Sequence, residues 1–174
     1  MCKRLLFVVA FILYSFTFTV IGMSAQIPAA SESDVTRPDK KEILDWMNQA
    51  TKIPATQQDE KIATALKNIS ASDSATPRSD FQLCVASAYL GNAKAQRCVG
   101  YAYEKGFGVV DDLMESHAWF TLASHGGDAE SEADVARVTI LLNSAYPAPS
   151  EEELEVQEKA QKEKIADYQK ELKK

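Results

Sequence analysis

Residues 93–126 read AKAQRCVGYAYEKGFGVVDDLMESHAWFTLASHG, and this stretch decides the fold of the chain. In its first half, small and apolar residues recur at the spacing of one helix face. These residues are Ala95, Val99 and Tyr103. In its second half, a similar face is formed by Leu113, Ser116, Phe120 and Ala123. The stretch therefore predicts two amphipathic helices that pack against each other.

A turn with two glycines separates these predicted helices. Gly106 and Gly108 can adopt the backbone conformations that a tight antiparallel connection requires. Asp112 lies near the start of the second helix, where its charge favours the positive end of the helix dipole. The small residues Gly100 and Ala123 would let two backbones approach closely. Together these features predict an antiparallel helix pair.

Parts of this pair recur elsewhere in the chain. The segment at residues 91–95 returns at residues 127–131, an offset of 36 that also places Val99 on Val135. An offset of 35 places Cys84 on Trp119. Periods in this range are typical of stacked helix pairs.

Twelve residues of the pair form a pattern with characteristic spacing. They are Ala95, Gln96, Val99, Gly100, Tyr103, Gly106, Gly108, Val109, Asp112, Trp119, Ala123 and Gly126. This pattern resembles the Sel-one-like repeat, a branch of the tetratricopeptide superfamily. Departures from the family pattern, none of which would break a helix pair, are Val99, Val110, Ser116 and Ser124. The resemblance covers one full repeat and extends through degenerate flanks over residues 81–143.

The resemblance implies both a fold and a function. Members of the family form stacked helix pairs with a concave surface, and they generally act as adaptors or assembly scaffolds. One repeat cannot bury its apolar face alone, so flanking helices should stack on it. We therefore expect an all-α, short α-solenoid of antiparallel helix pairs that binds another protein.

The flanks supply further predicted helices. Residues 38–50 form a first helix with the stripe Ile43, Leu44 and Met47, and Thr36 is its expected cap. A second helix covers residues 56–69. Residues 70–79 are rich in serine and contain Pro77, which predicts a loop, and a third helix follows over residues 81–90. The helical-repeat domain thus spans residues 38–145.

The tail at residues 149–174 is a charged segment that begins with a capping box at Ser150 and Glu153. Its apolar residues fall on one helical stripe, Leu154, Ile165, Tyr168 and Leu172, but Glu158 and Gln161 interrupt this stripe. We expect a solvated helix that docks only through its last apolar residues. A partner-binding helix is the alternative.

The N-terminus has the features of a signal peptide. Lys3 and Arg4 precede an apolar run over residues 5–21, and small residues follow up to Ala25. We predict cleavage after Ala25, a linker at residues 26–37, and a periplasmic or secreted protein of the bacterial envelope. Alternatively, residues 5–23 stay uncleaved as an inner-membrane anchor, which would make the chain a membrane-tethered assembly factor.

Charge narrows the class of partner. Removal of residues 1–25 would leave 17 of the 19 basic residues beside 25 acidic ones. Nucleic-acid binding relies on counterion release by basic side chains, so a domain this acidic is not expected to bind nucleic acid. The expected partner is another protein.

Cys84 and Cys98 are the cysteines that remain after such a cleavage. They flank the predicted turn at Gly91, at similar distances, and the compartment is oxidising. A disulfide closing this loop would stabilise the fold by about 3 kcal/mol. Two buried thiols are the alternative, because Cys84 aligns with the inward-facing Trp119.

Chemical sites find little support in the sequence. His117 and His125 lack a closing set of ligands at metal-binding spacing, so we interpret both as surface histidines. We expect no catalytic, cofactor-binding or metal-binding residue, and an enzyme of unrecognised type is the remaining rival. Tyr101 lies off the Val99 to Tyr103 stripe, so it is either a core residue or a partner-binding residue in a groove.

Overall fold

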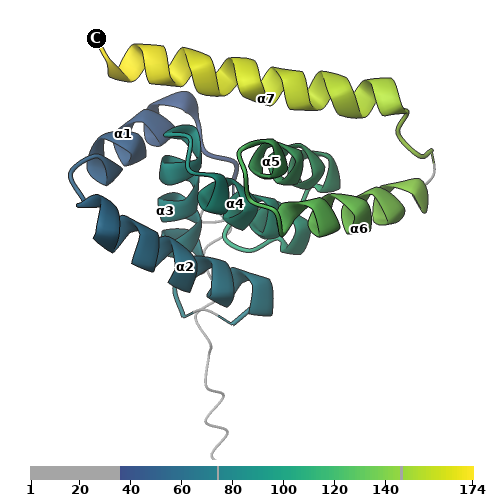
Figure 1. The fold of residues 1–174 in the computed structure, drawn as a ribbon, viewed down its shortest axis with the longest axis horizontal. Coiled ribbons are helices and arrows are strands. Elements are labelled where there is room, and N and C mark those ends of the chain that lie inside the picture. The colour runs from purple at the N-terminus through teal and green to yellow at the C-terminus, as the bar shows by residue number, and fades with distance from the viewer. Residues whose placement is uncertain (1–35, 74, 146) are drawn as a thin grey trace, which may run out of the picture.

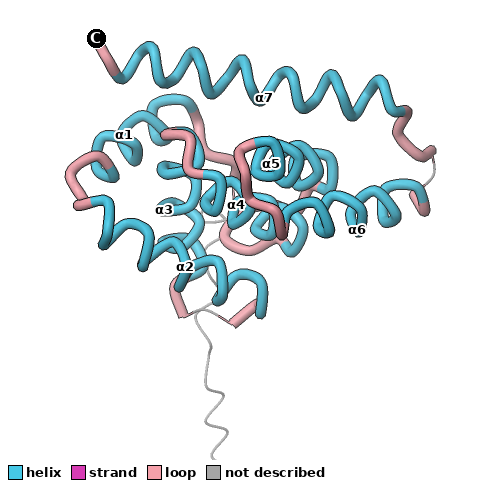
Figure 2. The backbone as a smooth tube through the Cα atoms, viewed as in Figure 1, coloured by secondary structure: helices cyan, strands magenta, loops and turns pink. Residues whose placement is uncertain are grey.

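The computed structural model describes residues 36–73, 75–145 and 147–174. Within these ranges every regular element is a helix and there is no strand, which confirms the predicted all-α solenoid (Figures 1 and 2). Its helices are α1 (Lys40–Ala50), α2 (Ala55–Ala71), α3 (Pro77–Tyr89), α4 (Ala93–Lys105), α5 (Leu113–His125), α6 (Ser131–Asn143) and α7 (Glu151–Leu172). The predicted signal peptide and most of the linker lie outside the described residues.

The helix pair α4 and α5 is the centre of the molecule. α4 packs against α2, α3 and α5, while α6 packs on α5 and α1 packs on α3. α7 then runs across the stack, where it contacts α5, α1 and α3 (Figure 1). None of the helices in the described ranges is both long and apolar enough to cross a membrane.

Helix starts are set by local hydrogen bonds. Asp39, and not the predicted Thr36, caps α1. Its carboxylate accepts from the backbone N–H of Glu42 at 2.8 Å, and the carboxylate of Glu42 accepts from the backbone N–H of Asp39 at 2.9 Å. This capping box delays the helix start from residue 38 to Lys40. Asp112 caps α5 by accepting from the N–H groups of Met114 and Glu115.

α3 begins at Pro77, four residues earlier than expected. We predicted a loop there because proline and serine are typical of loops. The prediction was wrong because proline has no N–H to lose at the first position of a helix, and its fixed φ suits that position.

The repeat residues pack as an inward-facing set. Those buried in the core are Ala95, Gln96, Val99, Gly100, Tyr103, Val109, Trp119 and Ala123. Gly106 and Gly108 have φ values of 63° and 76°, the left-handed conformations expected for the turn. A Cβ on Gly108 would also lie 2.6 Å from the carbonyl oxygen of Pro77, so the turn fits tightly against the start of α3.

Gly100 permits a close approach of a different kind from the one predicted. A Cβ at this position would lie 2.7 Å from the ring of Phe120 on α5. The glycine therefore makes room for an aromatic side chain and not for a second backbone.

Candidate functional site

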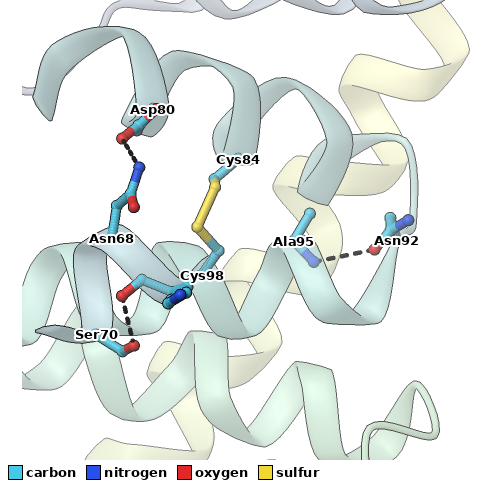
Figure 3. Close-up of a disulfide and its surroundings, with 8 residues drawn as sticks. Asn68, Ser70, Asp80, Cys84, Asn92, Ala95 and Cys98 are labelled. Carbon is cyan, nitrogen blue, oxygen red and sulfur yellow. Dashed lines mark hydrogen bonds between the residues drawn. A yellow bond between two sulfur atoms is a disulfide. The ribbon is translucent and has the colours of Figure 1, made fainter. Parts of the chain in front are cut away.

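The predicted disulfide has the geometry that its formation requires (Figure 3). The Sγ atoms of Cys84 on α3 and Cys98 on α4 lie 2.10 Å apart, and the Cα atoms lie 5.9 Å apart. Both residues are fully buried. A bond in this position ties two neighbouring helices together, and its burial favours a structural role over a reactive one.

A groove opens at the N-terminal end of the solenoid, where α1 and α2 both pack on α3. It consists of two open hollows of about 780 Å³ and 160 Å³ that share Ser79 and Leu83. We call this surface the N-terminal groove. Its lining consists of Trp46, Gln49, Ala50, Gln57, Glu60, Lys61, Thr64, Ser79, Asp80, Gln82, Leu83 and Ala86.

The groove combines a partly apolar floor with a polar rim. Trp46 and Leu83 are half-buried and pack against the main core. The guanidinium of Arg78 lies 5.4 Å from the centroid of the Trp46 ring, a cation–π distance that holds the indole in place. Glu60 and Lys61 place one charge of each sign on the α2 wall. An anchored tryptophan beside an aliphatic residue is typical of a surface that binds a protein segment.

Sequence reasoning missed Trp46. It lies on α1 directly beside the predicted stripe of Ile43, Leu44 and Met47, and periodicity alone assigns it to the margin of that stripe. A large aromatic residue at the margin of an apolar stripe, on a terminal helix of a solenoid, is the signal that could have identified it.

Tyr101 lies in the seam between α4 and α6, away from the N-terminal groove. Its hydroxyl donates to Asp134 Oδ1 at 2.6 Å, and its half-buried ring meets the edge of Phe120 at 5.0 Å between centroids. The guanidinium groups of Arg97 and Arg137 both lie within 6 Å of its ring. The side chain thus joins two helices, and its polar atom already has a partner.

Charged groups hold this seam together. Arg97 pairs with Asp134 at 2.6 Å and with Glu130, while Arg137 pairs with Asp134 at 2.9 Å and with Glu104. Burial raises the pKa of Asp134, but hydrogen bonds from Tyr101, Arg137 and Arg97 outweigh it and hold the pKa below its usual value. The charged side chains of the seam are therefore paired with one another.

A second polar cluster lies beneath α7. Glu115 is 5% exposed, and its carboxylate accepts hydrogen bonds from the side-chain amides of Gln157, at 3.1 Å, and Gln161. Arg37 Nη1 approaches the same carboxylate at 3.5 Å. Two amides and a guanidinium thus replace the water that a buried carboxylate loses.

Aromatic rings continue this contact toward the C-terminus. Tyr168 of α7 stacks on Tyr89 with centroids 4.9 Å apart, and Tyr89 meets Trp119 edge-to-face at 5.4 Å. Gln169 donates to the carbonyl oxygen of Tyr89 at 2.8 Å. Burial raises the pKa of Tyr89 well above its usual range. We call this set of contacts, together with those of Glu115, the α7 seam.

The α7 seam corrects our expectation for the tail. We expected docking only through the last apolar residues, with Gln161 as an interruption. Ile165, Tyr168 and Leu172 do pack on the core, as expected, but Gln161 is also buried, at 2% exposed, because its amide meets a buried carboxylate that the stripe analysis could not foresee. The predicted capping box at Ser150 and Glu153 is confirmed.

The two histidines differ in exposure. His125 is exposed, and its Nδ1 lies 3.0 Å from Glu158 Oε1 of α7. His117 is half-buried and lines an open hollow beside the start of α7, so it is less exposed than the surface position that we predicted. Burial lowers its pKa, although the nearby charge of Glu158 opposes that shift. Across the described ranges, no group of three or more His, Cys, Asp or Glu is arranged to hold a metal ion.

Comparison of the chain with known protein families, curated proteins and solved structures found no match. The geometry described above is therefore the basis for assigning a function, together with the sequence pattern of residues 93–126.

Proposed function

We propose that this chain is an exported adaptor or scaffold protein of the bacterial envelope, with a Sel-one-like repeat at its centre, that binds another protein in the N-terminal groove. The observation that carries the proposal is the groove itself. It is open and large enough for several side chains of a partner, and its floor presents Trp46 and Leu83. Solenoids present such surfaces for extended contact with partners.

The chemistry of the lining supports a protein as the ligand. Protein interfaces combine a central aromatic or aliphatic anchor with a rim of polar side chains that can form hydrogen bonds. The rim of the groove supplies glutamines, a threonine and a serine, together with the charged side chains of Glu60, Lys61 and Asp80. The excess of acidic residues over the whole chain disfavours nucleic acid.

Site-specific photo-crosslinking in the envelope of living cells tests the proposal. A photoreactive amino acid at Gln57, on the groove wall, should yield a defined adduct with another protein. The same probe at Lys159, an exposed position on α7, is the matched control and should yield none. Thr64→Arg places a long charged side chain on the exposed rim without touching the core, so it should abolish the adduct while the circular dichroism spectrum stays unchanged.

Equal crosslinking at Gln57 and Lys159, or an adduct that survives Thr64→Arg, would rule out the groove as the binding site.

N-terminal sequencing of the exported chain tests whether it is released from the membrane. A start near Gln26 supports a periplasmic or secreted adaptor, whereas an intact Met1 in the membrane fraction supports the tethered assembly factor.

A further inference from the structure

A small cavity lies beneath α7, where this helix meets α1, α3, α4 and α5. Its volume is about 80 Å³, and we call it the α7 cavity. Its wall includes four aromatic and two buried polar side chains, namely Tyr89, Tyr103, Trp119, Tyr168, Glu115 and Gln161. Liquid water occupies about 30 Å³ per molecule, so the cavity has room for a ligand of about four non-hydrogen atoms.

Two polar side chains of this wall carry an atom without a hydrogen-bond partner. Trp119 is 1% exposed and Gln161 is 2% exposed. Within the described residues, the indole Nε1 of Trp119 and the amide Oε1 of Gln161 are buried and form no hydrogen bond. Leaving a buried donor or acceptor unpaired costs free energy, so the two atoms indicate a molecule that pairs with both. That molecule must accept from Trp119 and donate to Gln161.

The charge of the cavity favours a cation as this molecule. The carboxylate of Glu115 can accept about four hydrogen bonds, of which the amides of Gln157 and Gln161 supply two. Burial raises the pKa of Tyr103 above its usual value, and the negative charge of Glu115 raises it further. The faces of aromatic rings attract cations as well. A positively charged group is therefore stabilised by both kinds of wall residue.

Arg37 shows that a cation suits the edge of this cavity. Its guanidinium lies 5.8 Å from the centroid of the Tyr103 ring, and its Nη1 lies 3.5 Å from Glu115 Oε1. The side chain is 50% exposed, so it borders the solvent side of the cavity and leaves the buried part to another group. A cation that enters would compete with Arg37 for the same carboxylate.

We infer that the α7 cavity binds a small organic cation that carries an ammonium group next to a hydrogen-bond acceptor such as a hydroxyl. The ammonium donates to Glu115 and to Oε1 of Gln161 while it faces the aromatic rings. The hydroxyl accepts from Nε1 of Trp119. An amino alcohol with four non-hydrogen atoms meets these requirements. This inference is independent of the N-terminal groove.

Titration of the full chain with ethanolamine, followed by the indole N–H signals in NMR spectra, tests the inference. The chain has two tryptophans, so Trp46 in the N-terminal groove is the internal control. The Trp119 signal should shift in a saturable manner, with a dissociation constant of about 0.1–10 mM for so small a ligand, while the Trp46 signal stays in place. Ethylamine, which lacks the hydroxyl, should bind about fivefold more weakly. Ethylene glycol, which lacks the charge, should not bind.

Two variants assign the roles of the residues by calorimetric titration. Trp119→Phe keeps an aromatic ring but loses the N–H group, so it should weaken ethanolamine binding about fivefold and leave ethylamine binding unchanged. Arg37→Gln removes the competing cation from an exposed position and should tighten ethanolamine binding about threefold. Because Arg37 lies outside the core, this second variant remains informative if Trp119→Phe fails to fold.

Three outcomes would overturn the inference. A Trp119 signal that does not move at about 10 mM ethanolamine would show that the cavity holds only water. A shift of equal size with ethylene glycol would show that charge has no part in binding. Weaker binding to Arg37→Gln would show that the site favours a negative or neutral ligand.

Discussion

The central helix pair and α7 are both helical and both partly buried, yet they are held in place by different interactions. The pair α4 and α5, with α3 behind it, is packed through fully buried apolar side chains and tied by the Cys84–Cys98 link. α7 is held by amide contacts to one buried carboxylate, by stacked tyrosines, by exposed ion pairs and by three half-buried apolar side chains, Leu154, Ile165 and Leu172. Because the contacts of the first region are more completely buried and apolar, we expect it to be the stable core and α7 to open at a lower free energy.

Removal of an aromatic side chain from each region should give the largest difference. Trp119→Ala empties the centre of the core and should lower the free energy of unfolding by about 3–5 kcal/mol. Tyr168→Ala removes the stacked ring of α7 and should cost on the order of 1 kcal/mol, because its loss is met by local undocking. Chemical denaturation followed by circular dichroism measures both. Equal costs would show that α7 belongs to the same cooperative unit.

Breaking the disulfide should have the next largest effect. Cys84→Ala with Cys98→Ala opens a loop whose ends are 14 residues apart in sequence, which should cost about 3 kcal/mol in the chain-entropy model. The melting temperature should fall, and addition of reductant to the wild type should produce a similar fall. Reductant should leave the double variant unchanged. A wild type indifferent to reductant would show that the two cysteines are unlinked thiols.

Substitution of Gly100, which packs against Phe120, should have the next largest effect on the free energy of unfolding. Gly100→Ala brings a methyl group into the space of the ring and should cost about 1–3 kcal/mol, despite the better helix propensity of alanine. In a Phe120→Leu background the same substitution should cost less, since the smaller side chain leaves room. Thermal denaturation of the four variants gives the coupling energy. A coupling of zero would mean that the two helices adjust without strain.

Replacement of an amide by a carboxylate in the α7 seam should loosen α7 and leave the core intact. Gln161→Glu places a second carboxylate against the buried Glu115, so amide hydrogen exchange in α7 should accelerate by at least about tenfold while α4 and α5 stay protected. The double variant with Glu115→Gln restores a donor–acceptor pair and should return exchange toward the wild-type rate. Faster exchange throughout the molecule would contradict the separation of the two regions.

The smallest effect concerns pH. The pKa of His117 is lowered in the folded state, so the unfolded chain binds its proton at a higher pH than the folded chain does. The free energy of unfolding should therefore decrease as the pH falls through the usual histidine range, near 6.5. His117→Gln should flatten this dependence between about pH 7 and pH 5.5, as urea denaturation at each pH would show. Identical slopes for both proteins would exclude His117 as the cause.

Much of the core followed from the spacing of residues in the sequence. The stripe of Ala95, Val99 and Tyr103 identified the buried face of α4, and the alignment of Cys84 with Trp119 placed both residues inward. Such patterns are reliable because burial on a helix repeats with the helical period. The start of α3 was missed because Pro77 has the same chemistry in a loop and in the first turn of a helix.

The candidate sites were harder to predict from the sequence. Trp46 belongs to a groove formed by three helices, and no local pattern states how α1 and α2 will diverge. Tyr101 was left between core and groove, and the structure places its hydroxyl on Asp134, which lies 33 residues away. A contact between distant segments depends on the packing of whole helices, so periodicity within one helix cannot reveal it.

The sequence by itself determined the helices, their antiparallel pairing, the glycine turn and the nearness of the two cysteines, because each of these depends on residues close together in the chain. Tertiary structure alone decided the N-terminal groove, the charged seam between α4 and α6, and the position of α7. Gln161 illustrates the physical reason. Within α7 alone its amide only interrupts an apolar stripe. In the folded chain the same amide donates a hydrogen bond to the buried carboxylate of Glu115, which lies 46 residues earlier.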